Sequence, residues 1–255
     1  MGWVDSHCHL DFDDFDQEAL FAQLRSQGCE GVLIPATQAR FFDRVMSLKQ
    51  TYPELVRVAL GLHPYFLSEH CLDDLSRLEG AINRFKPDAI GECGLDFLLE
   101  APTHEQQFSY FRGQLELANT YNLPLVVHCR KAHDQLAREV SQAAFKAGGF
   151  IHGFSGSSQQ ASRYLKHGFV LGLGGALTYE RAKAMHKMVA ALPDDGYTLE
   201  TDSPDMPPAF ARHEQNTPLN VPKIAQYVAR LRDQPVETVL LHSRENFRRI
   251  LGEHI

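Results

Sequence analysis

The sequence predicts a single α/β barrel of eight parallel strands, a (β/α)₈ fold, across residues 1–255. Its length of 255 residues suits one domain of this kind. Short apolar, β-branched runs alternate with longer amphipathic stretches, and no linker, repeat or low-complexity tract interrupts them. In such a barrel the active site lies at the C-terminal ends of the strands. We therefore expect the functional side chains there.

The predicted strands cover eight short segments, namely residues 3–6, 31–36, 56–61, 89–91, 125–127, 150–151, 170–172 and 197–200. Amphipathic stretches such as residues 16–26 and 104–121 lie between them. In the second stretch, Phe108, Phe111 and Leu115 recur at steps of three and four, which marks one buried helix face. Strands that alternate with helices pair in parallel through right-handed crossovers. An open doubly wound sheet is the alternative, but it usually carries a glycine-rich loop after its first strand, and this sequence has none there.

Composition limits the class of function. A formal net charge of −7 argues against broad electrostatic binding of nucleic acid, so such a substrate would be gripped locally or with the help of metal ions. The five cysteines are scattered and form no CxxC pair, which is typical of reduced thiols. The first residues show no secretory signal, and no apolar run approaches the roughly 20 residues of a membrane helix. We expect a cytoplasmic protein with no membrane attachment and no obligate protein partner.

Histidines and carboxylates fall at the ends of the predicted strands. Alternate residues of a strand point to the same face, so His7 and His9 can share one metal ion while Cys8 points away. Four more ligand-type residues follow later strands: Glu92, His128, His152 and Asp202. One such residue at one strand end would be a weak signal. Ligand-type residues at five strand ends of one barrel predict a metal centre.

These six side chains predict two divalent metal ions. Mixed nitrogen and oxygen ligands suit zinc, manganese or, with more oxygen, magnesium. Six ligands exceed one tetrahedral site with an open position, but they fit two ions about 3.5–4 Å apart, bridged by a carboxylate and a water. Glu92 comes from the middle of the barrel order and is the predicted bridge.

Two residues near the predicted ligands are candidates for substrate binding. His63 precedes Pro64 and either contacts the substrate or caps a loop. Arg130 follows His128 and either contacts a phosphate or pairs with a nearby carboxylate.

Other neighbours of the ligands have supporting roles in this prediction. Asp5 and Asp96 are candidates to orient the ligands. Cys93 and Cys129 flank ligands, but strand alternation points them away from the metals, so we expect buried, unreactive thiols.

Several segments together resemble a known family: DSHCHLDF near the start, GLHP at 61–64, GECGLDF at 91–97, PLVVHCR at 124–130, IHGFSGS at 151–157 and LETDSPDMP at 199–207. With these motifs the sequence resembles the TatD family of metal-dependent deoxyribonucleases, within the amidohydrolase-like barrel superfamily. NVP at 220–222 and NFRRIL at 246–251 also fit, so the resemblance runs nearly end to end. It implies a divalent-metal barrel with His7, His9, Glu92, His128, His152 and Asp202 as ligands, and phosphodiesterase activity on DNA, of the exonuclease type.

A mechanism follows from this ligand set. One ion would be held by His7, His9, Glu92 and Asp202, and the other by Glu92, His128 and His152. Glu92 and Asp202 are the predicted catalytic residues, with Asp202 accepting a proton from the bridging water as general base. Arg130 and His63 would complete the phosphate site.

Other functions remain open from the sequence. A cyclic-amide or deaminating hydrolase of the wider superfamily shares the HxH strand, but many of these use a carbamylated lysine where this sequence has Glu92. An aminoacyl-tRNA deacylase is a further alternative. A non-enzyme alternative is a non-catalytic, metal-stabilised partner protein. A complete ligand set with an acidic base argues against it.

Overall fold

The computed structural model, which describes residues 2–12, 14–71, 73–100 and 103–252, confirms the (β/α)₈ barrel. The strands are β1 Trp3–Asp5, β2 Cys29–Pro35, β3 Val56–Leu60, β4 Ala89–Asp96, β5 Leu125–Arg130, β6 Gly149–Ile151, β7 Phe169–Leu173 and β8 Tyr197–Leu199. They are hydrogen-bonded in chain order, each parallel to the next. The Ser6 N–H donates to the Leu199 carbonyl at 3.0 Å, which brings β8 back beside β1. The doubly wound alternative is therefore wrong.

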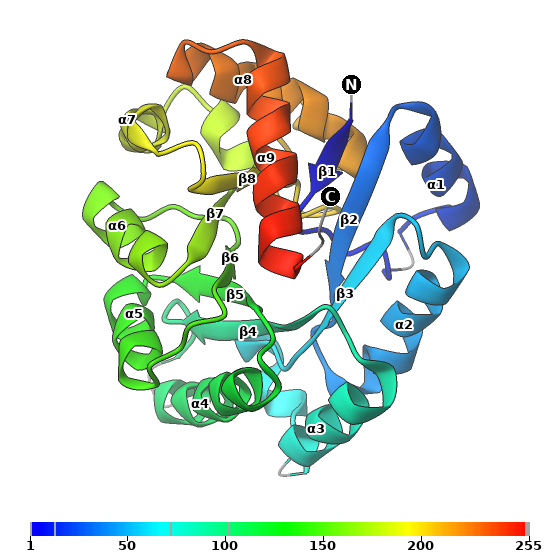
Figure 1. The fold of residues 1–255 in the computed structure, drawn as a ribbon, viewed down its shortest axis with the longest axis vertical. Helices are drawn as coiled ribbons and strands as arrows, with labels where there is room; N and C mark the ends of the chain where they lie inside the picture. The colour runs from blue at the N-terminus through cyan, green and yellow to red at the C-terminus, as the bar shows by residue number, and fades with distance from the viewer. Residues whose placement is uncertain (1, 13, 72, 101–102, 253–255) are drawn as a thin grey trace.

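Helices surround this sheet (Figure 1). They are α1 Gln17–Ser26, α2 Phe42–Thr51, α3 Asp74–Phe85, α4 His104–Tyr121, α5 His133–Gln142, α6 Ser158–Lys166, α7 Lys183–Ala191, α8 Val221–Arg232 and α9 Val236–Leu251. Local signals set their ends. Asp16 caps α1 by accepting the Ala19 N–H at 3.1 Å, and Ser157 with Gln160 forms a capping box at the start of α6. Among the described residues, no helix is both long and apolar enough to cross a membrane.

The largest difference from the sequence prediction lies in β4. The prediction ends this strand at Gly91, but the structure continues it to Asp96 with an irregular register between Ile90 and Cys93. Gly91 has φ of +148°, a conformation that favours glycine, and two glycines in six residues look like a turn. The irregularity shifts the alternation of side chains, so that Glu92 points into the barrel while Cys93 packs outside it.

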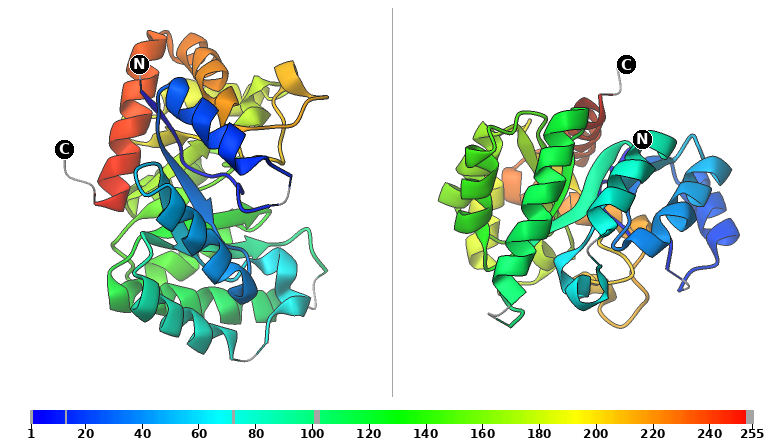
Figure 2. Two further views of the ribbon diagram at one scale, coloured as in Figure 1. Left: turned by 90° about the vertical axis from the view of Figure 1, so that its right-hand side faces the viewer. Right: turned by 90° about the horizontal axis from the view of Figure 1, so that it is seen from below.

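The barrel interior is apolar at the N-terminal ends of the strands. β1 to β7 each contribute one buried side chain to this layer: Val4, Leu33, Ala59, Ala89, Val126, Phe150 and Val170. Phe247 and Ile250 of α9 pack against it from below. Figure 1 shows α9 lying across this end of the barrel, and Figure 2 shows the loop after β8 at the opposite end.

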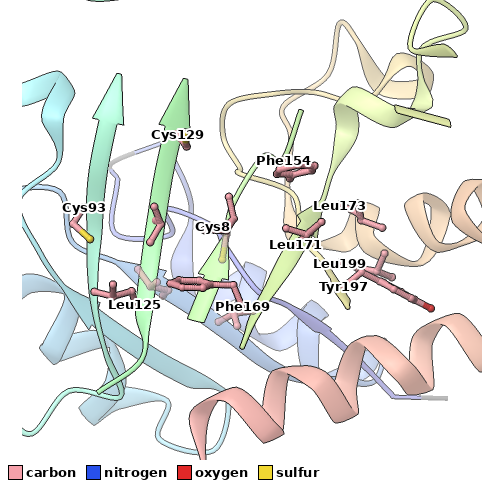
Figure 3. Close-up of a cluster of buried hydrophobic side chains, with 14 of the residues drawn as sticks. Cys8, Cys93, Leu125, Cys129, Phe154, Phe169, Leu171, Leu173, Tyr197 and Leu199 are labelled. Atoms are coloured by element: carbon pink, nitrogen blue, oxygen red, sulfur yellow. The ribbon is translucent and has the colours of Figure 1, made fainter. Parts of the chain in front are cut away.

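A second, larger core lies between the strands and the surrounding helices. Cys8, Cys93 and Cys129 belong to this layer, among the side chains in Figure 3. All three point outward from the barrel, which leaves the interior at the C-terminal end to polar side chains.

Candidate metal centre

One buried carboxylate lies at the middle of the C-terminal end of the barrel. Glu92 is 1% exposed, and imidazoles from four other parts of the chain surround it. At its Oε1 atom are His63 Nε2 at 3.0 Å, His152 Nε2 at 3.1 Å and His128 Nδ1 at 3.3 Å, and at Oε2 are His7 Nε2 at 3.3 Å and His9 Nε2 at 3.5 Å. Glu92 therefore contacts more of these side chains than any other member of the predicted set.

The segment after β1 positions the first histidine pair. The Nε2 atoms of His7 and His9 lie 3.3 Å apart, while Cys8 is fully buried in the outer core. This is the arrangement that strand alternation predicts. Asp5 supports the segment by accepting the backbone N–H groups of His7 and Thr201, each at 3.1 Å. Asp5 thus orients the backbone here, and burial raises its pKa to about 8.

Asp202 approaches the same pair from the end of β8. Its Oδ1 lies 3.5 Å from His7 Nε2 and 3.6 Å from His9 Nε2, and its backbone N–H donates to the His7 carbonyl at 2.9 Å. The side chain keeps 16% of its surface exposed, on the cleft side. Burial raises the pKa of Asp202 to about 7; the charge of His152 opposes this rise and that of Glu92 adds to it.

A second histidine pair comes from the opposite wall. His128 Nδ1, in β5, lies 3.2 Å from His152 Nε2, just after β6. The other ring nitrogen of His128 lies 3.0 Å from Asp96 Oδ2, which is the orienting contact expected of Asp96. This contact places the His128 proton on Nε2 and leaves Nδ1 free to face Glu92.

Burial and neighbouring charges divide the protonation states of this centre. Burial lowers the pKa of His7 well below its usual value and that of His9 to about 4, so both rings are neutral. Burial alone would raise the pKa of Glu92, but the surrounding imidazoles hold it well below its usual value. Burial also lowers the pKa of His128 and His152, but hydrogen bonds and charges from neighbouring carboxylates outweigh it and raise the pKa of both rings, that of His152 well above its usual value. The ionised Glu92 and the neutral rings of His7 and His9 are electron-pair donors.

These donors fit divalent metal ions. Three groups have donor atoms within 4.8 Å of one another: His7–Glu92–His152, His7–His9–Asp202 and His63–Glu92–His128. The Nδ1 atoms of His7, His9 and His152 are buried without a hydrogen-bond partner among the described residues. Paired nitrogens at 3.2–3.3 Å beside carboxylate oxygens match the ligands of first-row divalent ions.

His63 differs from the other histidines in its tautomer. Its Nδ1 accepts the Tyr65 N–H at 2.9 Å, so in the neutral ring the proton lies on Nε2 and is donated to Glu92 Oε1. A nitrogen that carries a proton cannot bind a metal. His63 is therefore better suited to donate a hydrogen bond, although its distances also satisfy a ligand group. It caps the turn after β3, which is one of the two roles that the sequence left open. It also lines the cleft, and its contact with a substrate stays a prediction.

A cleft of about 440 Å³ opens above the centre. Arg130, the last residue of β5, is exposed on its wall. Burial raises the pKa of Asp96, but the hydrogen bond from His128 and the charge of Arg130 together hold it below its usual value. Three aromatic rings also line the cleft: Phe12, Tyr65 and Phe66.

One buried carboxylate at this end of the barrel is not among the residues predicted from the sequence. Glu200 follows β8 directly, is 1% exposed, and accepts the Gly153 N–H at 2.5 Å. Its Oε1 lies 3.8 Å from His152 Nδ1. The available signal was a second acidic residue at the strand end that carries Asp202.

The two thiols beside the predicted ligands are buried, as expected. Cys93 Sγ lies 3.7 Å from the Val126 carbonyl, and Cys129 Sγ lies 3.8 Å from the Tyr164 hydroxyl. Burial raises the pKa of both, that of Cys129 to about 12. Neither thiol forms a reactive thiolate near neutral pH.

The barrel and its buried histidine–carboxylate centre define the class of the protein, a metal-dependent hydrolase. A model of the family described as TatD related DNase matches residues 4–252. The chain belongs to this TatD family.

Individual relatives agree with this assignment. The chain is 38% identical to "Uncharacterized metal-dependent hydrolase YjjV" of Escherichia coli over 241 residues, which is 93% of each chain. It is 31% identical to "3'-5' ssDNA/RNA exonuclease TatD" of Pantoea ananatis, covering 93% of this chain and 94% of that one. Among solved structures, the E. coli TatD homologue YjjV superposes with a TM-score of 0.93 at 36% identity, covering 97% of both chains.

Proposed function

We propose that the protein is a divalent-metal-dependent phosphodiesterase that hydrolyses nucleic acid, with DNA as the first substrate to test. The observation that carries this proposal is the position of Glu92, a single buried carboxylate within 3.5 Å of five imidazoles at the floor of an open cleft. A carboxylate in this position suits a bridge between two cations.

The ligands divide between two sides of Glu92. We assign His7, His9 and Asp202 to one ion, and His128 with His152 to the other, with Glu92 shared. When bound, zinc, manganese or magnesium ions would neutralise charge on phosphate oxygens and lower the pKa of a water molecule.

The protein's own groups supply the remaining chemistry. Asp202 borders the cleft beside His7 and His9, so its carboxylate can accept a proton from the attacking water. His63 can turn its Nε2–H from Glu92 to a phosphate oxygen, because Tyr65 fixes the proton on that nitrogen. The guanidinium of Arg130 can bind the same phosphate at the cleft wall.

Aromatic side chains support a nucleic-acid substrate. Tyr65 is 65% exposed and, with Phe12 and Phe66, offers aromatic faces on which unpaired bases can stack. Stacking needs no basic surface, which agrees with the net charge of −7. The relative from P. ananatis is named an exonuclease of single-stranded DNA and RNA, which supports the same class of substrate.

The alternative amidohydrolase activity has weaker support. β4 presents Glu92 where a carbamylated lysine would stand, and no lysine lies in β4 among its residues Ala89–Asp96. Solved structures of a dihydroorotase and a 5-methylcytosine deaminase are 14% and 13% identical to this chain, so they show the fold alone.

One preparation tests the proposal. We would measure metal content by elemental analysis and then assay the same sample on end-labelled single-stranded DNA, duplex DNA, RNA, aminoacyl-tRNA and dihydroorotate. We expect about two divalent ions per chain and cleavage of single-stranded DNA that disappears after chelation and returns with Mn²⁺, Zn²⁺ or Mg²⁺. Glu92→Gln should lose both ions and activity, whereas Glu139→Gln, a buried carboxylate paired with Arg112 outside the barrel, should retain them.

Two results would contradict the proposal. A metal-free sample that cleaves DNA at the full rate would remove the metal centre from the mechanism. A metal-loaded sample that leaves every nucleic acid intact but hydrolyses dihydroorotate or aminoacyl-tRNA would contradict the phosphodiesterase activity. It would support an amidohydrolase or a deacylase instead.

A further inference from the structure

Glu200 has an unusual environment for a carboxylate outside the proposed ligand set. It is 1% exposed, at the end of β8. One oxygen, Oε1, accepts the Gly153 N–H, while Oε2 has no hydrogen-bond partner among the described residues. A buried carboxylate with one unsatisfied oxygen is costly, so its presence calls for a specific role.

The end of β7 leaves room for this carboxylate. A Cβ atom on Gly172 would lie 1.9 Å from Glu200 Oε2, and one on Gly174 would lie 3.3 Å from Glu200 Cγ. The backbone at Gly174, with φ of −119°, is open to other residues. At these two positions the absence of a side chain therefore provides space rather than backbone freedom.

The carboxylate faces the rear nitrogen of His152. Glu200 Oε1 is 3.8 Å from His152 Nδ1, and that Nδ1 is buried without a hydrogen-bond partner among the described residues. The other nitrogen, Nε2, points to Glu92 Oε1 at 3.1 Å. A neutral imidazole can offer Nε2 to a cation only when its proton lies on Nδ1. That proton needs an acceptor, and Glu200 is in reach after a small rotation.

The same arrangement exists at the neighbouring ring with the nitrogens exchanged. His128 gives its Nε2 to Asp96 at 3.0 Å and turns Nδ1 to the centre. His152 turns Nε2 to the centre and has Glu200 behind Nδ1. Each member of this pair thus has a buried carboxylate on the side away from Glu92.

We propose that Glu200 is a positioning residue that accepts the Nδ1–H of His152 and thereby fixes the tautomer that presents Nε2 to the metal ion shared with Glu92. Gly172 in β7 and Gly174 just after it make this possible by leaving space for the Glu200 side chain. The inference rests on the proposed metal centre, and it adds a residue whose effect on the ion passes through His152. A carboxylate behind a histidine ligand fixes the ring and makes the ligand more basic.

The test uses the full chain and two substitutions at one position. Glu200→Gln keeps one oxygen acceptor, and Glu200→Met fills the hollow with no acceptor. We expect the affinity for Zn²⁺, measured by competition with a chelator, to fall about 10-fold in Glu200→Gln and about 100-fold in Glu200→Met. The number of ions bound at saturation should not change. Glu139→Gln, with a buried carboxylate paired to Arg112, serves as the control and should bind Zn²⁺ as wild type does.

A second readout does not involve metal. Nitrogen-15 NMR of the histidine rings, recorded for the metal-free chain at a pH high enough that His152 is neutral, should show the proton of His152 on Nδ1 in the wild type and a mixture of tautomers in Glu200→Met. Thermal unfolding checks that both variants are folded. If Glu200→Met does not fold, Glu200→Gln alone still tests the proposal.

The outcomes separate this inference from the proposed function. Wild-type affinity and the Nδ1–H form in both variants would overturn the role of Glu200 and leave the metal centre intact. Loss of one whole ion at saturating Zn²⁺ would overturn it in favour of direct ligation by Glu200. A wild-type chain that binds no Zn²⁺, Mn²⁺ or Mg²⁺ would instead refute the metal centre itself.

Discussion

The two ends of the barrel use the same eight strands for opposite purposes. At the N-terminal end, the interior is an apolar layer that Phe247 and Ile250 of α9 cover. At the C-terminal end, the interior holds histidines and carboxylates that are equally buried, with His7 at 0% and Glu92 at 1% exposure. Side chains are thus equally buried at both ends, but burial contributes to the free energy of folding in opposite ways. Burying apolar side chains at the N-terminal end stabilises the fold, whereas burying polar side chains at the C-terminal end is costly unless they find partners.

Some buried polar atoms at the C-terminal end lack such partners. The Nδ1 atoms of His7, His9 and His152 and the Oε2 atom of Glu200 are buried at the C-terminal end without a hydrogen-bond partner among the described residues. The C-terminal end is therefore suited to chemistry, and the N-terminal end to stability. Substitutions should separate the two properties.

The largest expected effect is on activity, at Asp202. Asp202→Asn keeps the size and one ligand oxygen but cannot accept a proton, so hydrolysis of DNA should fall about 10²–10⁴-fold. Both ions should remain largely bound, since the other ligands persist, and the melting temperature should change little. The measurements are turnover and metal content on the same sample. Asp205→Asn, an exposed carboxylate on the same cleft, is the control. Wild-type turnover in Asp202→Asn would remove its role as base.

At Phe247 we expect a loss of stability without a loss of activity. This ring is 2% exposed against the apolar layer, so Phe247→Ala should lower the free energy of unfolding by about 3–5 kcal/mol. Turnover per folded molecule should stay at the wild-type value, because the ring lies at the far end from Glu92. Denaturant unfolding and active-site titration measure the two quantities. Leu241→Ala, on the same helix but 39% exposed, should cost far less. Equal losses in both variants would contradict the role given to α9.

A smaller effect, on substrate binding, should distinguish the aromatic part of the cleft from its phosphate-binding part. Tyr65→Ala should weaken binding of single-stranded DNA by about 1–3 kcal/mol, or about 5- to 150-fold, because one stacked base loses its platform. It should not affect a phosphodiester without a base. Arg130→Ala should weaken both substrates, since its guanidinium binds the phosphate they share. Michaelis constants for an oligonucleotide and bis-p-nitrophenyl phosphate measure the difference. If Tyr65→Ala impaired both substrates equally, stacking would not be its function.

The smallest effect is expected at the thiols of the outer core. Cys93→Ser should keep turnover within about twofold of wild type, because its side chain points away from Glu92, and should cost about 1 kcal/mol of stability for a hydroxyl in an apolar site. Kinetics and thermal unfolding test this. A large loss of turnover in a folded, metal-loaded variant would show that the thiol takes part in the chemistry.

The barrel could be predicted from the sequence, as could the grouping of the candidate ligands at one end of it, because both depend on local patterns. The apolar runs identified all eight strands, and the HxH alternation placed His7 and His9 on one side with Cys8 on the other. The length of β4 was missed because Gly91 and Gly94 look like a turn, and the shift in register depends on close contact with β5.

Residues that act through long-range contacts could not be found in this way. Glu200 is defined by its distance to His152 and by the space at Gly172, which no local spacing encodes. The tautomer of His63 depends on the turn that brings Tyr65 N–H to its Nδ1. The packing of Phe247 beneath the barrel likewise joins the last helix to strands that precede it by most of the chain.

The pairing of β1 with β8 determines when the protein can become functional during its synthesis. The segment with His7 and His9 emerges from the ribosome early in synthesis. The partner strand β8 and Asp202 emerge only after nearly the whole barrel, and α9 emerges later still. Until then, His7 and His9 lack their contact with Asp202, and the apolar layer lacks the side chains of α9 that cover it. We therefore expect the proposed metal centre to be completed only after β8 and α9 have been synthesised.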